Sequence, residues 1–117
     1  MELVKIFKAL EDETRLRILN LLRNSELCVC EIQYALETTQ SNTSRHLTNL
    51  SNAGLAIPTK KAQWVSYKIN EDILLEHPFI QEVLSHELDK LEQCKRDLEK
   101  LAECKNNGIP CELTKEG

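Results

Sequence analysis

The sequence has few of the residues that build turns or large aromatic cores. Its 117 residues include three glycines, three prolines, two phenylalanines, two tyrosines and one tryptophan. With 41 % apolar residues, this composition predicts one compact, helix-rich domain with a small and mainly aliphatic core. No stretch approaches about 18 uninterrupted apolar residues, and the N-terminus lacks a cleavable signal pattern, so we expect a cytoplasmic protein with no membrane partner.

Acidic side chains are absent from residues 38–70, although the whole chain carries a net charge of −4. Arg45, Lys60, Lys61 and Lys68 lie inside that span. A positive region on an otherwise acidic protein attracts DNA to one face and repels it from the others, which orients docking. Chance clustering of charge is the alternative interpretation.

Residues 39–53 have the pattern of a helix that presents hydrogen-bonding groups outward. Thr39 can cap its N-terminus, and Gly54 can end it because glycine adopts a left-handed conformation without steric cost. The helical period places an apolar face at Thr43, Leu47 and Leu50. The opposite face carries Ser41, Asn42, Arg45, Thr48, Asn49 and Asn52. Hydroxyls, amides and a guanidinium without a carboxylate fit phosphates and base edges, so we interpret this segment as a DNA recognition helix.

A β-hairpin is predicted directly after this helix. Residues 55–57 and 65–69 alternate in polarity as strands do, and Lys60-Lys61-Ala62-Gln63 lies between them. A helix pair followed by a hairpin with a basic tip is the winged helix-turn-helix plan, a mainly α fold with a small β-hairpin. Lys60 and Lys61 would contact phosphates, unless they are simply the solvated tip of the hairpin.

The first and last helices are the expected dimer interface. Residues 3–10 are apolar over much of their circumference, and a single long helix is predicted from Ile80 to about Lys105, followed by a tail over 106–117. Leucines recur every seven residues along that helix and form a seam wide enough for a partner helix. The predicted interface residues are Leu3, Phe7, Leu84, Leu88, Leu91 and Leu98.

Five cysteines, an odd number, favour reduced thiols over a disulfide framework. Two of them lie in the run Glu26-Leu-Cys-Val-Cys-Glu-Ile32. Residues two apart face the same side of an extended segment but lie about 200° apart on a helix. We expect Cys28 and Cys30 to straddle a strand-to-helix junction, where the helix N-terminus favours the thiolate that binds metal or arsenic. The alternative is that both are small core residues.

Three segments together resemble the ArsR/SmtB family of dimeric winged-helix repressors, which leave DNA when they bind an inducer. They are residues 11–19, 26–32 and 40–55. The Cys-Val-Cys run is similar to the arsenic- and antimony-sensing branch of the family. The resemblance implies that arsenite or antimonite on thiolates relieves repression, with no required cofactor. It also implies a DNA-facing or DNA-adjacent set at Gln40, Ser41, Ser44, Arg45 and His46.

Two positions depart from the pattern of that branch. Gln33 stands where a third cysteine is typical, and trivalent arsenic prefers three sulfurs. Either two sulfurs suffice with a small third ligand, or the third ligand comes from Cys94, Cys104 or Cys111. At the wing tip Ala62-Gln63 replaces Gly-Arg, so a tight turn is harder to form there. The predicted DNA contacts are Gln40, Ser41, Asn42, Ser44, Arg45, His46, Asn49, Lys60, Lys61 and Gln63.

Several other functions are compatible with parts of the sequence. A Cd, Pb or Zn sensor would use His77, His86 and Asp89, and a thiol redox switch would join two cysteines. A winged-helix module that binds protein would need no DNA. An enzyme is not expected, since no nucleophile–base pair or carboxylate dyad stands out. The mechanism we expect is that arsenite at Cys28 and Cys30 distorts the adjacent helix, so that the two recognition helices of a homodimer lose register on operator DNA.

Overall fold

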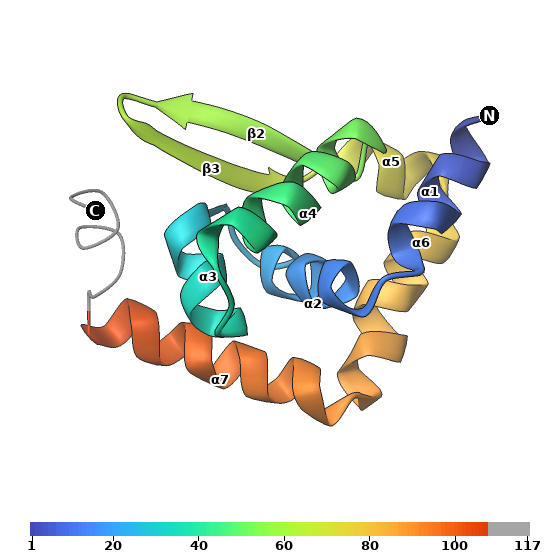
Figure 1. Cartoon of the computed structure of the whole chain (residues 1–117). Helices are drawn as coiled ribbons and strands as arrows, with labels where there is room; N and C mark the ends of the chain where they lie inside the picture. The colour runs from blue at the N-terminus through green and yellow to red at the C-terminus, as the bar shows by residue number, and fades with distance from the viewer. Residues whose placement is uncertain (108–117) are drawn as a thin grey trace.

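The computed structural model describes residues 1–107, apart from the side chain of Lys61. Figure 1 shows a helical body from which one hairpin projects. In chain order the elements are α1 (Glu2–Leu10), α2 (Glu13–Leu22), β1 (Leu27–Cys28), α3 (Val29–Leu36), α4 (Gln40–Asn52), β2 (Ala56–Lys61), β3 (Trp64–Ile69), α5 (Glu71–Glu76), α6 (Pro78–Glu82), the π-helical turn η1 (Val83–Glu87), the 3-10 turn η2 (Leu88–Lys90) and α7 (Glu92–Asn107). The mainly α fold with a small hairpin is confirmed.

Local capping signals set the bounds of α2 and α4. Asp12 caps α2 by accepting a hydrogen bond from the Arg15 backbone N–H at 3.1 Å. Thr39 does the same for α4, accepting from the Asn42 N–H at 3.1 Å. Gly54 follows α4 with a φ of 81°, the left-handed conformation that favours glycine. The predicted start and end of the recognition helix are therefore confirmed.

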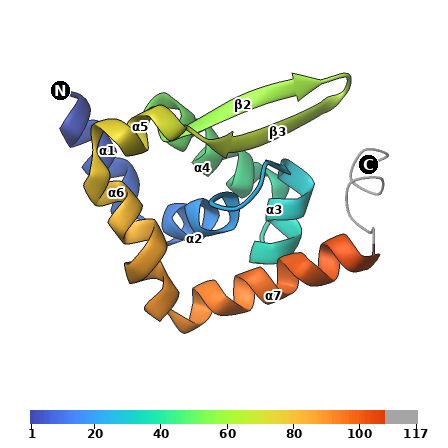
Figure 2. The ribbon, with the colours of Figure 1, turned by 180° about the vertical axis from the view of Figure 1, so that it is seen from behind.

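The core lies between α2, α3, α4 and the C-terminal helices. Leu19 of α2, Ile32 of α3 and Leu47 of α4 have no exposed surface. Thr43 and Leu50 are equally buried, so the inward face predicted for α4 is the inward face in the structure. Both views show α7 running below α2 and α3, opposite the hairpin (Figures 1 and 2).

The three strands form an antiparallel sheet in the order β1-β3-β2. In the hairpin Lys61 pairs with Trp64, which leaves Ala62 and Gln63 as the turn. Ala62 takes a φ of 57° there, a conformation that costs a non-glycine residue free energy. The turn thus forms without glycine, and the strain is placed on Ala62. On the other edge of β3, Ser66 pairs with Cys28, which ties the cysteine segment to the hairpin.

The prediction of one long helix from Ile80 to Lys105 is wrong. The chain passes from α6 through η1 and η2, becomes extended at Leu91 (φ −91°, ψ 124°), and then begins α7 in a new direction (Figure 1). Arg23 fixes this corner by donating to the Leu84 carbonyl and to the Asp89 carboxylate. α7 continues to Asn107, two residues beyond the predicted end. No helix in residues 1–107 is long and apolar enough to cross a membrane.

The corner also divides the predicted leucine seam. Leu84 and Leu88 are each 2 % exposed and pack inside the protomer, so they are not available at a subunit interface. Leu91 is 47 % exposed at the break, and Leu98 is half-buried on α7. A seven-residue spacing predicts a shared face only within one continuous helix, and here the helix is interrupted.

Candidate DNA-binding and inducer sites

The outer face of α4 presents the polar side chains that its sequence pattern predicts. Gln40, Ser41, Arg45 and Asn49 are exposed, while Asn42 and Ser44 are half-buried. Lys60 and Gln63 are exposed on the hairpin, and the side chain of Lys61 lies outside the described part of the chain. Because residues 38–70 contain no carboxylate, this surface attracts a polyanion.

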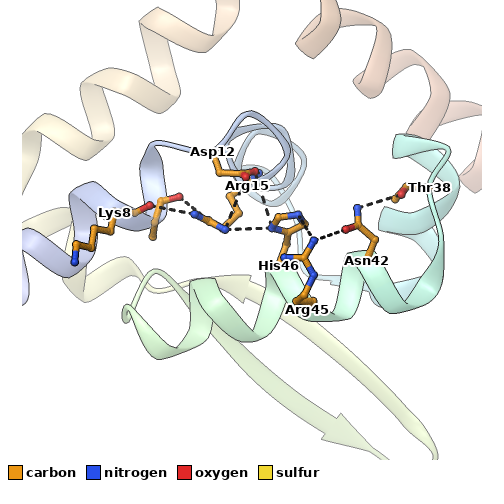
Figure 3. A network of polar contacts seen from close by, with 8 residues as sticks. Lys8, Asp12, Arg15, Thr38, Asn42, Arg45 and His46 are labelled. Carbon is orange, nitrogen blue, oxygen red and sulfur yellow. Dashed lines mark hydrogen bonds and ion pairs between the residues drawn. The ribbon is translucent and has the colours of Figure 1, made fainter.

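Arg45 is held in place by neighbours on its own helix (Figure 3). Its Nη2 donates to Asn42 Oδ1 at 2.6 Å, and Asn42 Nδ2 in turn donates to Thr38 Oγ1 at 3.2 Å. The same Nη2 lies 3.4 Å from His46 Nε2. A guanidinium that is already oriented loses less conformational entropy when it binds a phosphate or a base.

His46 does not reach the surface, so the prediction that it contacts DNA is wrong. It is 5 % exposed, and Arg15 Nη1 lies 3.3 Å from its Nδ1. Burial lowers the pKa of His46, as do the charges of Arg45 and Arg15, whereas Asp12 opposes them. The neutral imidazole therefore sits between two guanidinium groups and supports the recognition helix from behind (Figure 3).

Arg15 is the member of this network that sequence reasoning missed. Its Nε donates to the Ala9 carbonyl at 2.8 Å and its Nη2 to the Lys8 carbonyl at 3.1 Å, so it joins the end of α1 to α4 through His46. No local signal distinguishes a surface arginine from one that binds two distant carbonyls.

Cys28 and Cys30 lie at the predicted strand-to-helix junction. Cys28 is the extended N-cap residue of α3 (φ −81°, ψ 161°), and Cys30 is in the first turn of that helix. Their Sγ atoms are 2.7 Å apart, so both sulfurs point to one place. Glu31 completes a capping box by accepting from the Cys28 backbone N–H at 2.9 Å.

Two of the three candidates for a third ligand, Cys94 and Cys104, lie on α7. Cys94 is 2 % exposed and Cys104 is 1 % exposed, and burial raises the pKa of both thiols. Cys94 lies against α2, where its carbonyl accepts from Asn20 Nδ2 at 3.0 Å. Cys104 lies close enough to Glu31 of α3 for that carboxylate to raise the pKa of its thiol further, and a third ligand from α7 stays a prediction. The remaining candidate, Cys111, lies outside the described residues.

The histidines expected of a zinc-type sensor are also dispersed. His77 pairs with Glu2, His86 with Glu82, and Asp89 with Arg23. Among residues 1–107, three potential ligand atoms come within 4.8 Å of one another only at Glu2, Glu76 and His77. The set His77, His86 and Asp89 is therefore not a ligand cluster.

The two cysteines open into a hollow of about 340 Å³ between α3, α4 and the hairpin. Its wall includes Gln40 and Ser44 from the first turns of α4, and Trp64, Val65 and Tyr67 from β3. Sequence reasoning placed Cys28 and Cys30 upstream of the recognition helix. The pairing of Cys28 with Ser66 is what brings them beside the wing as well.

The sequence profile described as "Bacterial regulatory protein, arsR family" matches residues 12–57. The structure of HlyU from Vibrio cholerae is 37 % identical with a TM-score of 0.57, and the match covers 67 % of this chain and 90 % of that chain. This chain belongs to the ArsR family. The family members are bacterial regulators rather than enzymes, as the sequence predicts.

Other ArsR-family proteins extend this similarity. The arsenic resistance transcriptional regulator ArsR1 of Pseudomonas putida is 45 % identical over 69 residues, which are 58 % of this chain and 54 % of that protein. A cadmium resistance regulatory protein CadC homolog of Staphylococcus aureus is 37 % identical over 73 residues, 62 % of this chain and 60 % of that protein. The chain therefore spans little more than half the length of these curated relatives.

A solved relative also supports the fold assignment. The homodimeric winged helix-turn-helix DNA-binding domain of Mb0332 from Mycobacterium bovis is 29 % identical with a TM-score of 0.63. The match covers 70 % of this chain and 77 % of that domain. The winged helix-turn-helix architecture predicted from the sequence is confirmed.

Apolar side chains of this ArsR-family protein gather on the outside of α1. Leu3 is 39 % and Phe7 is 53 % exposed, and Phe7 stacks on Phe79 with ring centroids 5.3 Å apart. Val4, also on α1, is 45 % exposed. Of the six predicted interface residues, Leu3, Phe7 and Leu91 are exposed, Leu98 is half-buried, and Leu84 and Leu88 are buried.

Proposed function

We propose that this protein is an operator-binding repressor that leaves DNA when trivalent arsenic or antimony binds Cys28 and Cys30. The observation that carries the proposal is the shared hollow: the converging sulfurs open onto the same space as Gln40 and Ser44 of the recognition helix. The names of arsenic-resistance relatives support the inducer class.

The DNA-bound form in this proposal is a homodimer in the cytoplasm. Two copies of α4 enter successive major grooves about 34 Å apart, and the hairpins reach the flanking backbone with Lys60, Lys61 and Gln63. Gln40, Ser41, Asn42, Ser44, Arg45 and Asn49 supply the contacts from α4. The exposed apolar side chains of α1 are the surface through which the protomers would associate, as Mb0332 is described as homodimeric.

Inducer binding and DNA binding are coupled through short paths in this scheme. An ion held by both sulfurs pulls on the N-cap and first turn of α3, which packs on α4. It also displaces the hairpin, because Cys28 pairs with Ser66 of β3. A coupling free energy of roughly 1–3 kcal/mol changes DNA affinity between 5-fold and 150-fold.

The test is fluorescence anisotropy of DNA from upstream of this protein's own gene, titrated with reduced protein and then with arsenite. We expect salt-sensitive binding and release at stoichiometric arsenite. The variants Cys28→Ser and Cys30→Ser should bind DNA but resist release, whereas Cys94→Ala, which removes a buried thiol that lies against α2, should be released normally. Absence of salt-sensitive DNA binding, or equal release of the serine variants, contradicts the proposal.

A second candidate inducer is a soft divalent cation, favoured by the cadmium-resistance relative. Thiolates bind Cd, Pb and Zn as well as arsenic. Competition of each ion with arsenite, followed by the same anisotropy signal, separates these inducers. A thiol redox switch is distinguished by release with peroxide in the absence of any metal or arsenic.

A further inference from the structure

Basic side chains gather where α1 meets the last turn of α4. A hollow of about 380 Å³ lies between the two helices, and we call it the basic hollow. Three cations and one carboxylate line it: Lys5, Lys8, Arg15 and Glu11. Asn49 and Asn52 of α4, both exposed, add amide groups to the same wall. The basic hollow therefore carries a net positive charge and opens beside the outward face of the recognition helix.

The two lysines share one face of α1. The residues Ile6 and Ala9 are buried in the core, and the exposed apolar side chains of α1 lie at Leu3, Val4 and Phe7. Lys5 and Lys8, three residues apart, point to a third side of the helix. The helix thus separates a core face, an apolar exposed face and a basic face.

The lysines of this face are not neutralised by carboxylates. Within residues 1–107, Lys90, Lys100 and Lys105 pair with glutamates, whereas Lys5 and Lys8 take part in no ion pair. Both are exposed, so their ammonium groups can bind an external anion.

Arg15 fixes the basic face of α1 relative to α4. Its Nη2 donates to the Lys8 carbonyl, and its Nη1 lies 3.3 Å from Nδ1 of His46 on α4. Figure 3 shows the Lys8 side chain extending away from this network. The lysines and the outward face of α4 therefore keep a fixed relation to each other, which favours simultaneous binding to one partner.

The length of α4 places the basic hollow at a DNA backbone. Its 13 residues make a helix about 20 Å long, whereas the major groove is about 12 Å wide. Recognition helices insert their N-terminal residues among the base edges. The last turn of α4, with the basic hollow beside it, then lies at the phosphates that border the groove.

We propose that Lys5 and Lys8, together with Asn49 and Asn52, clamp the phosphate backbone of the operator at the end of the recognition helix. The inference rests on the proposed binding of DNA by α4, and it adds a contact from α1. Lysine and asparagine commonly bind phosphates, and such contacts position a protein without reading the sequence.

The position of α1 predicts where this clamp meets the operator. The exposed apolar side chains of α1 form the proposed dimer surface, so the two α1 helices of a homodimer face each other. Both views show the tip of the hairpin pointing away from α1 (Figures 1 and 2). The clamps therefore bind the backbone between the two major grooves that receive α4, and the hairpins bind outside them.

The experiment measures operator affinity by anisotropy at a series of salt concentrations. Each phosphate contact contributes about 0.9 to the slope of log K against log salt. Lys5→Gln/Lys8→Gln removes two lysines per protomer, so a homodimer should lose about 3 to 4 in slope and bind about tenfold or more weakly. The matched control Lys90→Gln/Lys95→Gln removes the same charge on η2 and α7 and should keep the wild-type slope.

Two further measurements distinguish a phosphate contact from damage to the fold or the dimer. Lys5→Arg/Lys8→Arg keeps both charges and should bind as wild type. Uncharged methylphosphonates in the backbone between the two grooves should weaken binding by the wild type but not by the glutamine variant, which has already lost the partners of those phosphates. Sedimentation and urea unfolding check the variants, and the effect of methylphosphonates on the wild type decides the question if the glutamine variant does not dimerise.

The outcomes separate this inference from the proposed function. A wild-type salt slope for Lys5→Gln/Lys8→Gln, or wild-type binding that methylphosphonates leave unchanged, overturns the clamp and leaves the operator-binding repressor in place. An equal loss of slope in Lys90→Gln/Lys95→Gln also overturns it, since the effect would then come from net charge alone. Absence of salt-sensitive DNA binding by the wild type overturns the proposed function and this inference together.

Discussion

The ion pair between Arg17 and Asp97 gives the sharpest stability prediction. Arg17 of α2 donates from Nε and Nη2 to both carboxylate oxygens of Asp97, at 2.8 and 2.9 Å. Gln93 donates to the same carboxylate at 3.0 Å. The Asp97 side chain is 1 % exposed and that of Arg17 is 20 % exposed. This pair fastens α7 to the core.

Replacing Arg17 by methionine leaves a buried carboxylate with one neutral donor. Breaking a buried pair from one side costs about 3–5 kcal/mol, and the partial exposure of Arg17 favours the lower end, about 3 kcal/mol. The double variant Arg17→Met/Asp97→Leu should recover most of that loss, because no charge is then left unpaired. The exposed pair of Arg96 with Glu92, 4.0 Å apart, is the matched control, and Arg96→Met should cost less than about 1 kcal/mol.

The assay is urea unfolding followed by circular dichroism, at one protomer concentration because dimer formation shifts apparent stability. A loss for Arg17→Met within about 1 kcal/mol of that for Arg96→Met would refute the reasoning. So would a double variant less stable than Arg17→Met alone, since the cost would then lie in lost packing and not in the buried charge.

Three further predictions concern the recognition helix α4, its neighbour His46 on the buried side, and the hairpin of β2 and β3. Ala62→Gly should raise the free energy of unfolding by about 1 kcal/mol, since it relieves a positive φ; an unchanged or lower urea midpoint contradicts this. Because burial lowers the pKa of His46, the unfolded chain takes up the proton first, so stability should fall as pH drops below the ordinary value of 6.5; the curve for His46→Asn should lack this fall. The pKa of Asp12 is also lowered, but this changes the free energy of unfolding only below pH 3.8, the ordinary pKa of an aspartate. The pH range in which Asp12 affects stability is therefore distinct from that of His46. Arg45→Ala should weaken operator binding roughly tenfold or more, whereas Arg96→Ala, on the distant α7, should bind as wild type in anisotropy.

Features that depend on neighbouring residues were predictable from the sequence. The caps Asp12 and Thr39 and the inward face of α4 follow from short-range hydrogen bonding and the helical period. The junction at Cys28 and Cys30 follows from the change of period on either side of it. Even the burial of His46 was accessible, because it lies three residues after Thr43 and four before Leu50, on the apolar face.

Features that depend on distant contacts were not predictable in this way. The helix break at Leu91 is accompanied by contacts of Arg23, more than sixty residues earlier, with Leu84 and Asp89. The hollow beside the cysteines requires the pairing of β1 with β3, which joins segments about forty residues apart. The spacing of apolar residues along a segment does not identify the strand with which it pairs or the charged residue that it contacts.

The most direct test of the account is reciprocity between the two ligands. If arsenic at Cys28 and Cys30 and operator DNA at α4 oppose each other, each must weaken the other's binding by the same factor. The measurement is the affinity of the reduced protein for arsenite, read from Trp64 fluorescence with and without saturating operator DNA. We predict a loss of affinity that equals the loss of DNA affinity caused by arsenite. An arsenite affinity unchanged by DNA would contradict the coupling on which the proposed function depends.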